Sequence, residues 1–139
     1  MRTVVRAVLF SAFLTIAVLC FGLVRKVQID ARCELARGEG LVASARLSES
    51  GDEWVAAGDA FVAAMACYVP FDAAPRRAAV RLLAVVDELA ERDRSADAAR
   101  LLGDALKRID ADTWLFVPLA EFRADLAGRL ERVALGHHG

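Results

Sequence analysis

The longest apolar run of the chain lies near its N-terminus. Residues Ala7 to Val24 carry no charge, and basic residues flank the run on both sides. As a helix, eighteen residues rise about 27 Å, close to the thickness of the hydrocarbon layer of a bilayer. We therefore predict a membrane-spanning helix over 7–24, with Phe13 near its centre, inside a signal-anchor segment of residues 1–26.

Two other interpretations of this run are weaker. A domain this small has too little core to surround a helix that is apolar on all sides. A cleaved signal peptide would use Arg2 and Arg6 as its basic region, but Val24-Arg25-Lys26-Val27 offers no pair of small residues for cleavage. The sequence favours an anchor that is retained.

The flanking charges bear on membrane orientation. Arg2 and Arg6 nearly balance Arg25, Lys26 and Arg32, but the short N-terminal tail is typical of a signal-anchor whose N-terminus stays in the cytoplasm. The preference for arginine over lysine and the abundance of alanine resemble the composition of GC-rich bacteria. The predicted location is the bacterial inner membrane with the C-terminal domain in the periplasm, and the cytoplasm is the alternative.

The remaining sequence predicts an all-α domain, because good helix formers dominate it and alternating strand patterns are almost missing. Residues 27–50 are predicted as a helical juxtamembrane connector with a break at Gly38-Glu-Gly40. Pro75 is expected in the first turn of a helix and Ser95 as an N-cap, and the short loop between these two helices predicts that they are antiparallel. The further predicted helices span 53–68, 75–92, 95–109 and 118–135, each with apolar residues at helical spacing.

Part of the chain resembles tetratricopeptide repeats. Gly51-Asp52 followed by alanines at 56, 60 and 63 and by Tyr68-x-Pro70 is similar to the second half of one repeat, and Asp93-x-x-x-x-Ala98 with Leu102 and Ala105 is similar again. The resemblance covers residues 50–110, although the spacing of 42 residues exceeds the family's roughly 34, and the Trp-Leu-Gly-Tyr order of the family's first helix is missing. The resemblance implies a small antiparallel bundle over 51–135 and a scaffold that carries a peptide or protein in a concave face. Gly136 is expected to end the last helix, which leaves residues 136–139 as a flexible tail.

Six residues are candidates for contact with a protein partner. The aromatic residues among them have a second, structural interpretation as core, which is the commoner fate of an aromatic at helical spacing. The three arginines cluster near the start of a predicted helix, where free N–H groups also favour a phosphate or an anionic headgroup. The candidates are Trp54, Phe61, Tyr68, Arg76, Arg77 and Arg81.

An aromatic-Val-Pro-apolar motif occurs twice, at Tyr68-Val-Pro-Phe71 and Phe116-Val-Pro-Leu119. We interpret it as a turn in which the aromatic residue docks on the preceding helix.

Charge and composition exclude several classes of protein. The net charge is -1, and the chain has no concentrated basic face of the kind that nucleic acid requires. The apolar content of 57% excludes intrinsic disorder.

The sequence offers little material for catalysis. It contains no HExxH, CxxC or phosphate-loop motif, and Gly38-Glu-Gly40 lacks the rest of a dinucleotide fingerprint. Its only histidines, His137 and His138, lie in the predicted tail. We therefore expect no enzyme, no metal, no cofactor and no small-molecule substrate.

The chain has three cysteines, and Cys20 lies within the predicted span. Cys33 and Cys67 are the two that an oxidising compartment would allow to pair. The preferred interpretation is that both are buried thiols that pack as small apolar side chains.

Two functional hypotheses follow. The first is a non-catalytic, membrane-anchored scaffold or adaptor that holds a protein partner at the membrane through its helical domain. The second is a small single-pass accessory subunit that contacts a larger membrane complex mainly through its transmembrane helix, where Phe10, Phe13 and Phe21 and small residues would pack on other helices.

Overall fold

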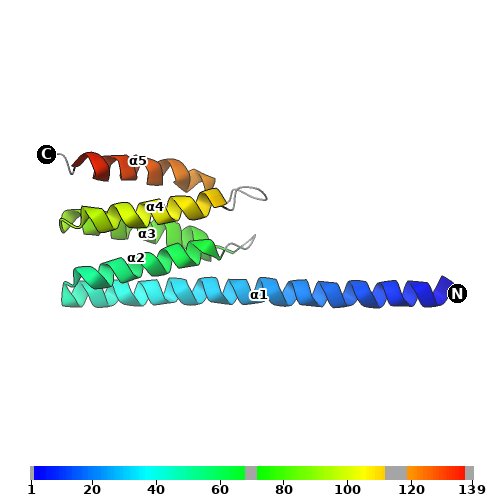
Figure 1. The fold of residues 1–139 in the computed structure, drawn as a ribbon. Helices are drawn as coiled ribbons and strands as arrows, with labels where there is room; N and C mark the ends of the chain where they lie inside the picture. Colours follow the sequence, from blue (N-terminus) through cyan, green and yellow to red (C-terminus); the bar gives the residue numbers. More distant parts are fainter. Residues whose placement is uncertain (1, 68–71, 112–118, 137–139) are drawn as a thin grey trace.

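The computed structural model describes residues 2–67, 72–111 and 119–136 (Figure 1). All regular secondary structure in these residues is α-helical, which confirms the all-α prediction. The helices are α1 (Arg2–Ser48), α2 (Gly51–Ala66), α3 (Ala74–Glu91), α4 (Ser95–Ala111) and α5 (Ala120–Gly136).

Helix α1 runs without a break for 47 residues, so the predicted interruption at Gly38-Glu-Gly40 is wrong. Gly38 is buried, and a Cβ atom added to it would lie 2.5 Å from Cε1 of the Phe61 ring. A glycine inside a helix costs about 0.5–1 kcal/mol relative to alanine, and here its missing side chain admits the ring of a neighbouring helix. Gly38 therefore serves helix packing and does not end the helix.

The two halves of α1 have different surroundings. In Figure 1 the N-terminal half extends alone away from the bundle, whereas the C-terminal half lies along α2. The change comes at Val27 and Gln28, which are half-buried, and Ala31 is the first fully buried residue. The segment expected to be a connector thus supplies part of the core, through Ala31, Leu35 and Ala45.

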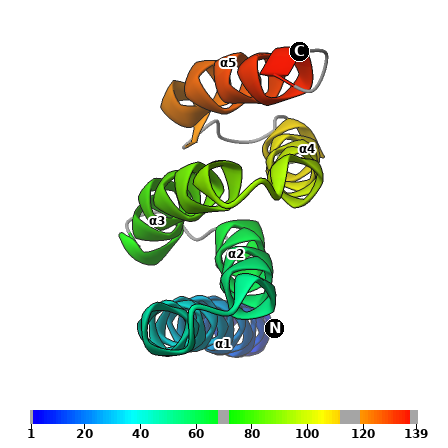
Figure 2. The same cartoon turned by 90° about the vertical axis from the view of Figure 1, so that its left-hand side faces the viewer.

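The helices form a stack in which each packs on the next helix in the sequence and on the one after it. Figure 2 shows α2 and α4 on one side of the stack and α3 on the other, with α1 and α5 at its two ends. Consecutive helices run in opposite directions, as the short loop between α3 and α4 predicted (Figure 1).

The predicted apolar stripes form the core of this stack. Leu82 and Leu89 of α3, Leu101 of α4 and Leu126 of α5 have no exposed surface. The stripe on α5 is completed by Leu119, which is buried, and by three half-buried side chains, Phe122, Leu130 and Val133.

Local interactions fix the ends of α3. Pro75 lies in the first turn, as predicted, and the Asp72 carboxylate accepts the N–H of Ala74 at 2.9 Å. At the other end Asp93 has a φ of 59°, and the next N–H, of Arg94, donates to the carbonyl of Leu89 at 2.9 Å. This is a Schellman ending, in which glycine is the usual residue at the position of Asp93.

The N-terminus of α4 is capped differently from the prediction. Ser95 is its first residue and not its N-cap, because the carbonyl of Arg94 already accepts the N–H of Ala98 at 3.1 Å. The Asp97 carboxylate lies in the first turn, where it accepts a hydrogen bond from Arg94 Nε at 2.7 Å.

Candidate functional site

The apolar segment of α1 is exposed from Val8 to Val24. From Val8 to Val24 none of its large side chains is covered by another helix, and Phe13 is 70% exposed. In the described residues α1 is the helix that is long and apolar enough to cross a bilayer. The core-helix interpretation is excluded, because apolar side chains of this kind would have to be covered in a soluble protein.

One polar side chain inside this segment makes a hydrogen bond within the helix. The Thr15 hydroxyl donates to the carbonyl of Ser11 at 2.9 Å, one turn back along α1. Such a bond removes the need for water, which a bilayer interior does not supply. The segment is bounded by Ala7, which belongs to the same helix, and by Arg25 and Lys26.

Two of the candidate aromatic residues lie in the core and not on the surface. Trp54 is 2% exposed and Phe61 has no exposed surface, so both belong to the core and are not available to a partner at the surface. The guanidinium of Arg92 lies 5.7 Å from the centre of the Trp54 ring and covers it. Tyr68 and both aromatic-Val-Pro motifs lie wholly or mostly outside the described residues, although Leu119 at the end of the second motif is buried.

The three candidate arginines of α3 do not form one anion site. Arg76 Nε lies 3.0 Å from a carboxylate oxygen of Glu121 on α5, and Arg81 Nε lies 3.7 Å from one of Glu39 on α1. Arg77 is exposed and makes no ion pair with any described residue. The cluster is therefore divided between two links to neighbouring helices and one free cation.

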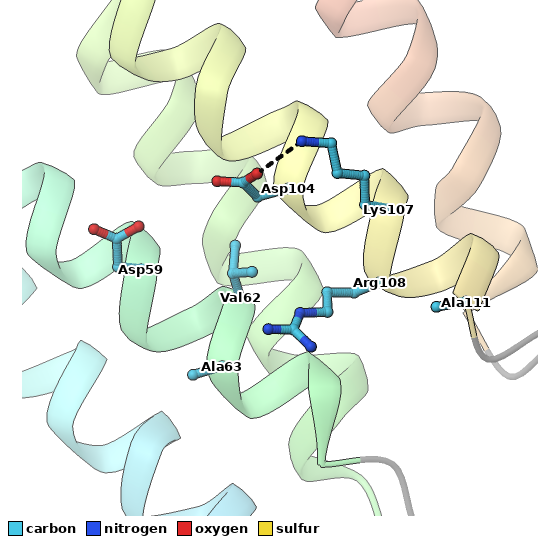
Figure 3. Close-up of a pocket in the computed structure, with 7 residues that line it drawn as sticks. All are labelled: Asp59, Val62, Ala63, Asp104, Lys107, Arg108 and Ala111. Atoms are coloured by element: carbon cyan, nitrogen blue, oxygen red, sulfur yellow. Dashed lines mark hydrogen bonds and ion pairs between the residues drawn. The ribbon is translucent and has the colours of Figure 1, made fainter.

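A groove with a volume of about 540 Å³ lies between α2 and α4. Figure 3 shows the side chains that line it, which come from these two helices alone. Close to it, Gly58 of α2 lets the helices approach, since a Cβ there would lie 2.4 Å from Leu101 of α4. The lining residues are Asp59, Val62, Ala63, Asp104, Lys107, Arg108 and Ala111.

Ion pairs neutralise the carboxylates of this groove. The guanidinium of Arg100 holds both oxygens of Asp59, at 2.8 and 3.2 Å, and reaches Asp104 at 3.4 Å. Hydrogen bonding to Asp59 raises the pKa of Arg100, with burial opposing and the charges of Asp59 and Asp104 adding to the rise. Lys107 Nζ lies 3.5 Å from the other oxygen of Asp104.

One cation of the groove is left over. Arg108 is exposed and makes no ion pair with any described residue, and Figure 3 shows it directed toward α2. The apolar side chains beside it are Val62, Ala63 and Ala111. A guanidinium next to an apolar surface matches a ligand that carries a carboxylate and an apolar group.

The residues that line this groove could not be identified from the sequence. Asp59 and Arg100 are 41 residues apart, and no local pattern links them. Only the spacing of Asp104, Lys107 and Arg108 on one helical face was visible in the sequence, and such a run is usually a solvated surface.

The cysteines are all free, and Cys33 is exposed, so the expectation of two buried thiols is wrong for Cys33. Cys67 is half-buried at the end of α2. Burial raises the pKa of the Cys67 thiol, and the carboxylates of Asp30 and Glu34 on α1 raise it further, against a smaller opposite effect of Arg108. A raised pKa lowers the fraction of thiolate, so Cys67 is a poor nucleophile.

Within the described residues, no group of three or more His, Cys, Asp or Glu side chains has the geometry of a metal site. The two histidines, His137 and His138, lie outside those residues. Comparisons with protein-family models, with curated proteins and with solved structures give no match.

Proposed function

We propose that this protein is a membrane-anchored, non-catalytic scaffold, in which α1 crosses the membrane and the helical stack holds a protein partner at the membrane surface. The observation that carries the proposal is the continuity of α1. One helix contains both the exposed apolar segment and, from Ala31 onward, part of the bundle core. An anchor of this kind holds the bundle close to the bilayer.

The arrangement of the helices supports a binding role. Each helix packs on the next and on the one after it, which is how helical hairpins stack in repeat proteins such as the tetratricopeptide family. Stacks of this kind expose grooves between helices, and here the groove between α2 and α4 joins an apolar floor to the free cation of Arg108. The proposed ligand is a segment of a partner protein that places a carboxylate on Arg108.

Two further expectations belong to this proposal. The predicted location is the bacterial inner membrane, with the N-terminus in the cytoplasm and the bundle in the periplasm. Because Cys33 is exposed, a membrane-impermeant thiol reagent should label it in intact cells. Labelling of Cys33 only after lysis would place the bundle in the cytoplasm.

A photo-crosslinking amino acid, introduced at single positions of the full chain, tests the binding role. At Ala63, on the floor of the groove, it should yield a crosslinked partner, and Arg108→Glu should abolish that product. Leu47 is 89% exposed and far from the groove, so the same amino acid there is the matched control. Equal products from both positions, or a product that survives Arg108→Glu, would refute binding in the groove.

The second function, an accessory subunit that binds through its span, is favoured by one observation. The phenyl rings of Phe10, Phe13 and Phe21 are all more than 65% exposed and are open to other transmembrane helices. Crosslinks from Phe13 to a membrane protein, with none from Ala63, would favour this function. The mass of the mature chain checks the anchor itself, because a chain shortened at its N-terminus would mean that the segment is a cleaved signal peptide.

A further inference from the structure

The distance between the apolar segment and the bundle is short. Val24 ends the apolar run, Val27 and Gln28 already contact the bundle, and Ala31 is fully buried. From Val24 to Ala31 the helix rises only about 10 Å. No break or glycine-induced kink separates the two parts, because α1 is continuous from Arg2 to Ser48.

A layer of lipid headgroups is about as thick as the rise of α1 from Val24 to Gln28, about 6 Å. The hydrocarbon core of a bilayer is about 30 Å thick and the whole bilayer about 40–45 Å, which leaves roughly 5–8 Å of headgroups on each side. If Val24 lies at the edge of the hydrocarbon, the headgroups reach to about the level of Val27 and Gln28. The end of the bundle that faces the N-terminal half of α1, here called the near end, then touches the lipid headgroups.

This near end is built from four helix ends besides α1. Figure 1 shows that the last turns of α2 and α4 and the first turns of α3 and α5 all point toward the N-terminal half of α1. Side chains of a helix lean toward its N-terminus. The side chains in the first turn of α3, and those of α1 next to the span, therefore lean toward the membrane.

The charges at the near end are mostly paired. Arg32 lies 3.2 Å from Asp72, Arg76 pairs with Glu121, and Arg123 lies 2.8 Å from Asp110. These pairs join α1 to the residues just before α3, α3 to α5, and α5 to α4, so they link the helix ends. The positive charge of each of these arginines is balanced by a carboxylate.

Apart from Arg108, which lines the groove between α2 and α4, three cations remain at this end. Arg25, Lys26 and Arg77 are exposed and make no ion pair with any described residue, whereas Asp30 is a single carboxylate opposing them on α1. Arg25 and Lys26 directly follow the apolar run, and Arg77 lies near the start of α3.

We propose that the near end of the bundle is a docking surface for anionic phospholipids, with Arg77, Arg25 and Lys26 binding headgroup phosphates. The bundle then rests on the membrane in a fixed orientation, with the ends at Ser48 and Glu91 pointing away from it. The proposal rests on the proposed anchoring by α1. Without the anchor, three cations spread over two helices would bind a membrane only weakly, since each contributes about a fivefold preference.

Fluorescence quenching in vesicles tests the docking. The full chain, with Cys20 and Cys67 replaced by alanine, carries a fluorophore on Cys33, which is exposed at the near end. A second version, also with Cys33→Ser, carries it on Leu47→Cys, about 21 Å farther along α1. The vesicles contain a nitroxide at the top of the acyl chain, either on phosphatidylglycerol or on phosphatidylcholine at the same mole fraction.

We expect phosphatidylglycerol to quench the Cys33 fluorophore several-fold more than phosphatidylcholine, and neither lipid to quench the fluorophore at residue 47. Arg77→Gln should lower the preference at Cys33 by about two- to fivefold. Arg46→Gln is the matched control, because Arg46 is an exposed arginine on the far part of α1 that also has no ion-pair partner in the described residues. It should leave the preference unchanged.

Three results would overturn the docking surface: equal quenching by the two lipids, equal effects of Arg77→Gln and Arg46→Gln, or quenching at residue 47 as strong as at Cys33. Flotation of the protein with the vesicles is measured in the same samples. Loss of flotation would refute the anchor and hence the proposed function, whereas flotation without lipid preference would refute the docking surface alone.

Discussion

Replacing Gly38 by alanine tests whether the C-terminal half of α1 belongs to the bundle core. The added Cβ would lie 2.5, 2.7 and 2.9 Å from three carbons of the Phe61 ring. Carbon atoms in contact are normally about 3.5–4.0 Å apart, so the ring has to retreat by roughly 1 Å. Phe61 has no exposed surface, and its neighbours in the core oppose that movement.

The expected free-energy change combines two opposing contributions. Overpacking a core costs about 1–3 kcal/mol, whereas alanine stabilises a helix relative to glycine by about 0.5–1 kcal/mol. Gly40→Ala supplies the second contribution alone, because Gly40 is exposed and a Cβ there meets nothing within 4 Å. The difference in unfolding free energy between the two variants isolates the packing contribution, about 1–3 kcal/mol.

Thermal unfolding of the full chain in detergent, followed by far-ultraviolet circular dichroism, measures this difference. In a domain of this size 1 kcal/mol corresponds to about 4–8 °C in the unfolding midpoint. Gly40→Ala should unfold at a higher temperature than the wild type, and Gly38→Ala below Gly40→Ala by at least 4 °C, taking the lower bound of that conversion. Phe61→Leu replaces the ring by a smaller side chain. In this background the difference in midpoint between Gly38→Ala and Gly40→Ala should be smaller.

Equal midpoints for Gly38→Ala and Gly40→Ala would refute the reasoning. They would mean that Phe61 does not lie against Gly38, and that the C-terminal half of α1 is not packed in the bundle core. The proposed scaffold would then lose the continuous link between its anchor and its core.

Three further predictions concern other parts of the bundle. Asp93→Gly should raise the unfolding midpoint by several degrees, because a φ of 59° costs a non-glycine residue about 1 kcal/mol; an unchanged or lower midpoint would contradict the Schellman ending. Leu126→Ala should destabilise the bundle by about 2–5 kcal/mol, since Leu126 is fully buried where α5 covers the stack; a loss below 1 kcal/mol in the same melt would show that α5 is not docked. At a pH below the ordinary thiol pKa of 9.0, iodoacetamide should alkylate Cys33 faster than Cys67, and Asp30→Asn should raise the alkylation rate of Cys67 by removing a charge that disfavours its thiolate. Mass spectrometry of the alkylated peptides measures both rates. Equal rates for Cys67 and Cys33 would refute the burial of Cys67.

The start of α3 and the apolar stripes of the helices were the most predictable parts of the bundle. Pro75 is restricted by its ring to a helix start, and the Leu82–Leu89 stripe repeats at the helical period, so neighbouring residues determine both features. The exposed apolar segment was equally predictable, because eighteen uncharged residues allow few alternatives.

Features that depend on distant residues were not predictable. Whether Gly38 breaks or continues a helix depends on Phe61, which lies on another helix. The groove depends on the contact between Asp59 of α2 and Arg100 of α4. The burial of the Trp54 ring depends on contacts with distant residues such as Arg92. Local propensity carries no information on such pairs, which only the packing determines.

The order of packing in the stack bears on how the chain folds. In the described residues, each contact between helices joins a helix to the next one in the sequence or to the one after it. Each helix can therefore pack without a partner that is far away in the sequence. Chains dominated by such local contacts fold quickly, and domains made on the ribosome fold from the N-terminus. The first surface available to the growing bundle is the outer half of α1, which is fixed to the anchor as soon as the anchor is inserted. Assembly of the bundle should therefore begin on α1 and proceed away from it, one helix at a time, in the order of synthesis.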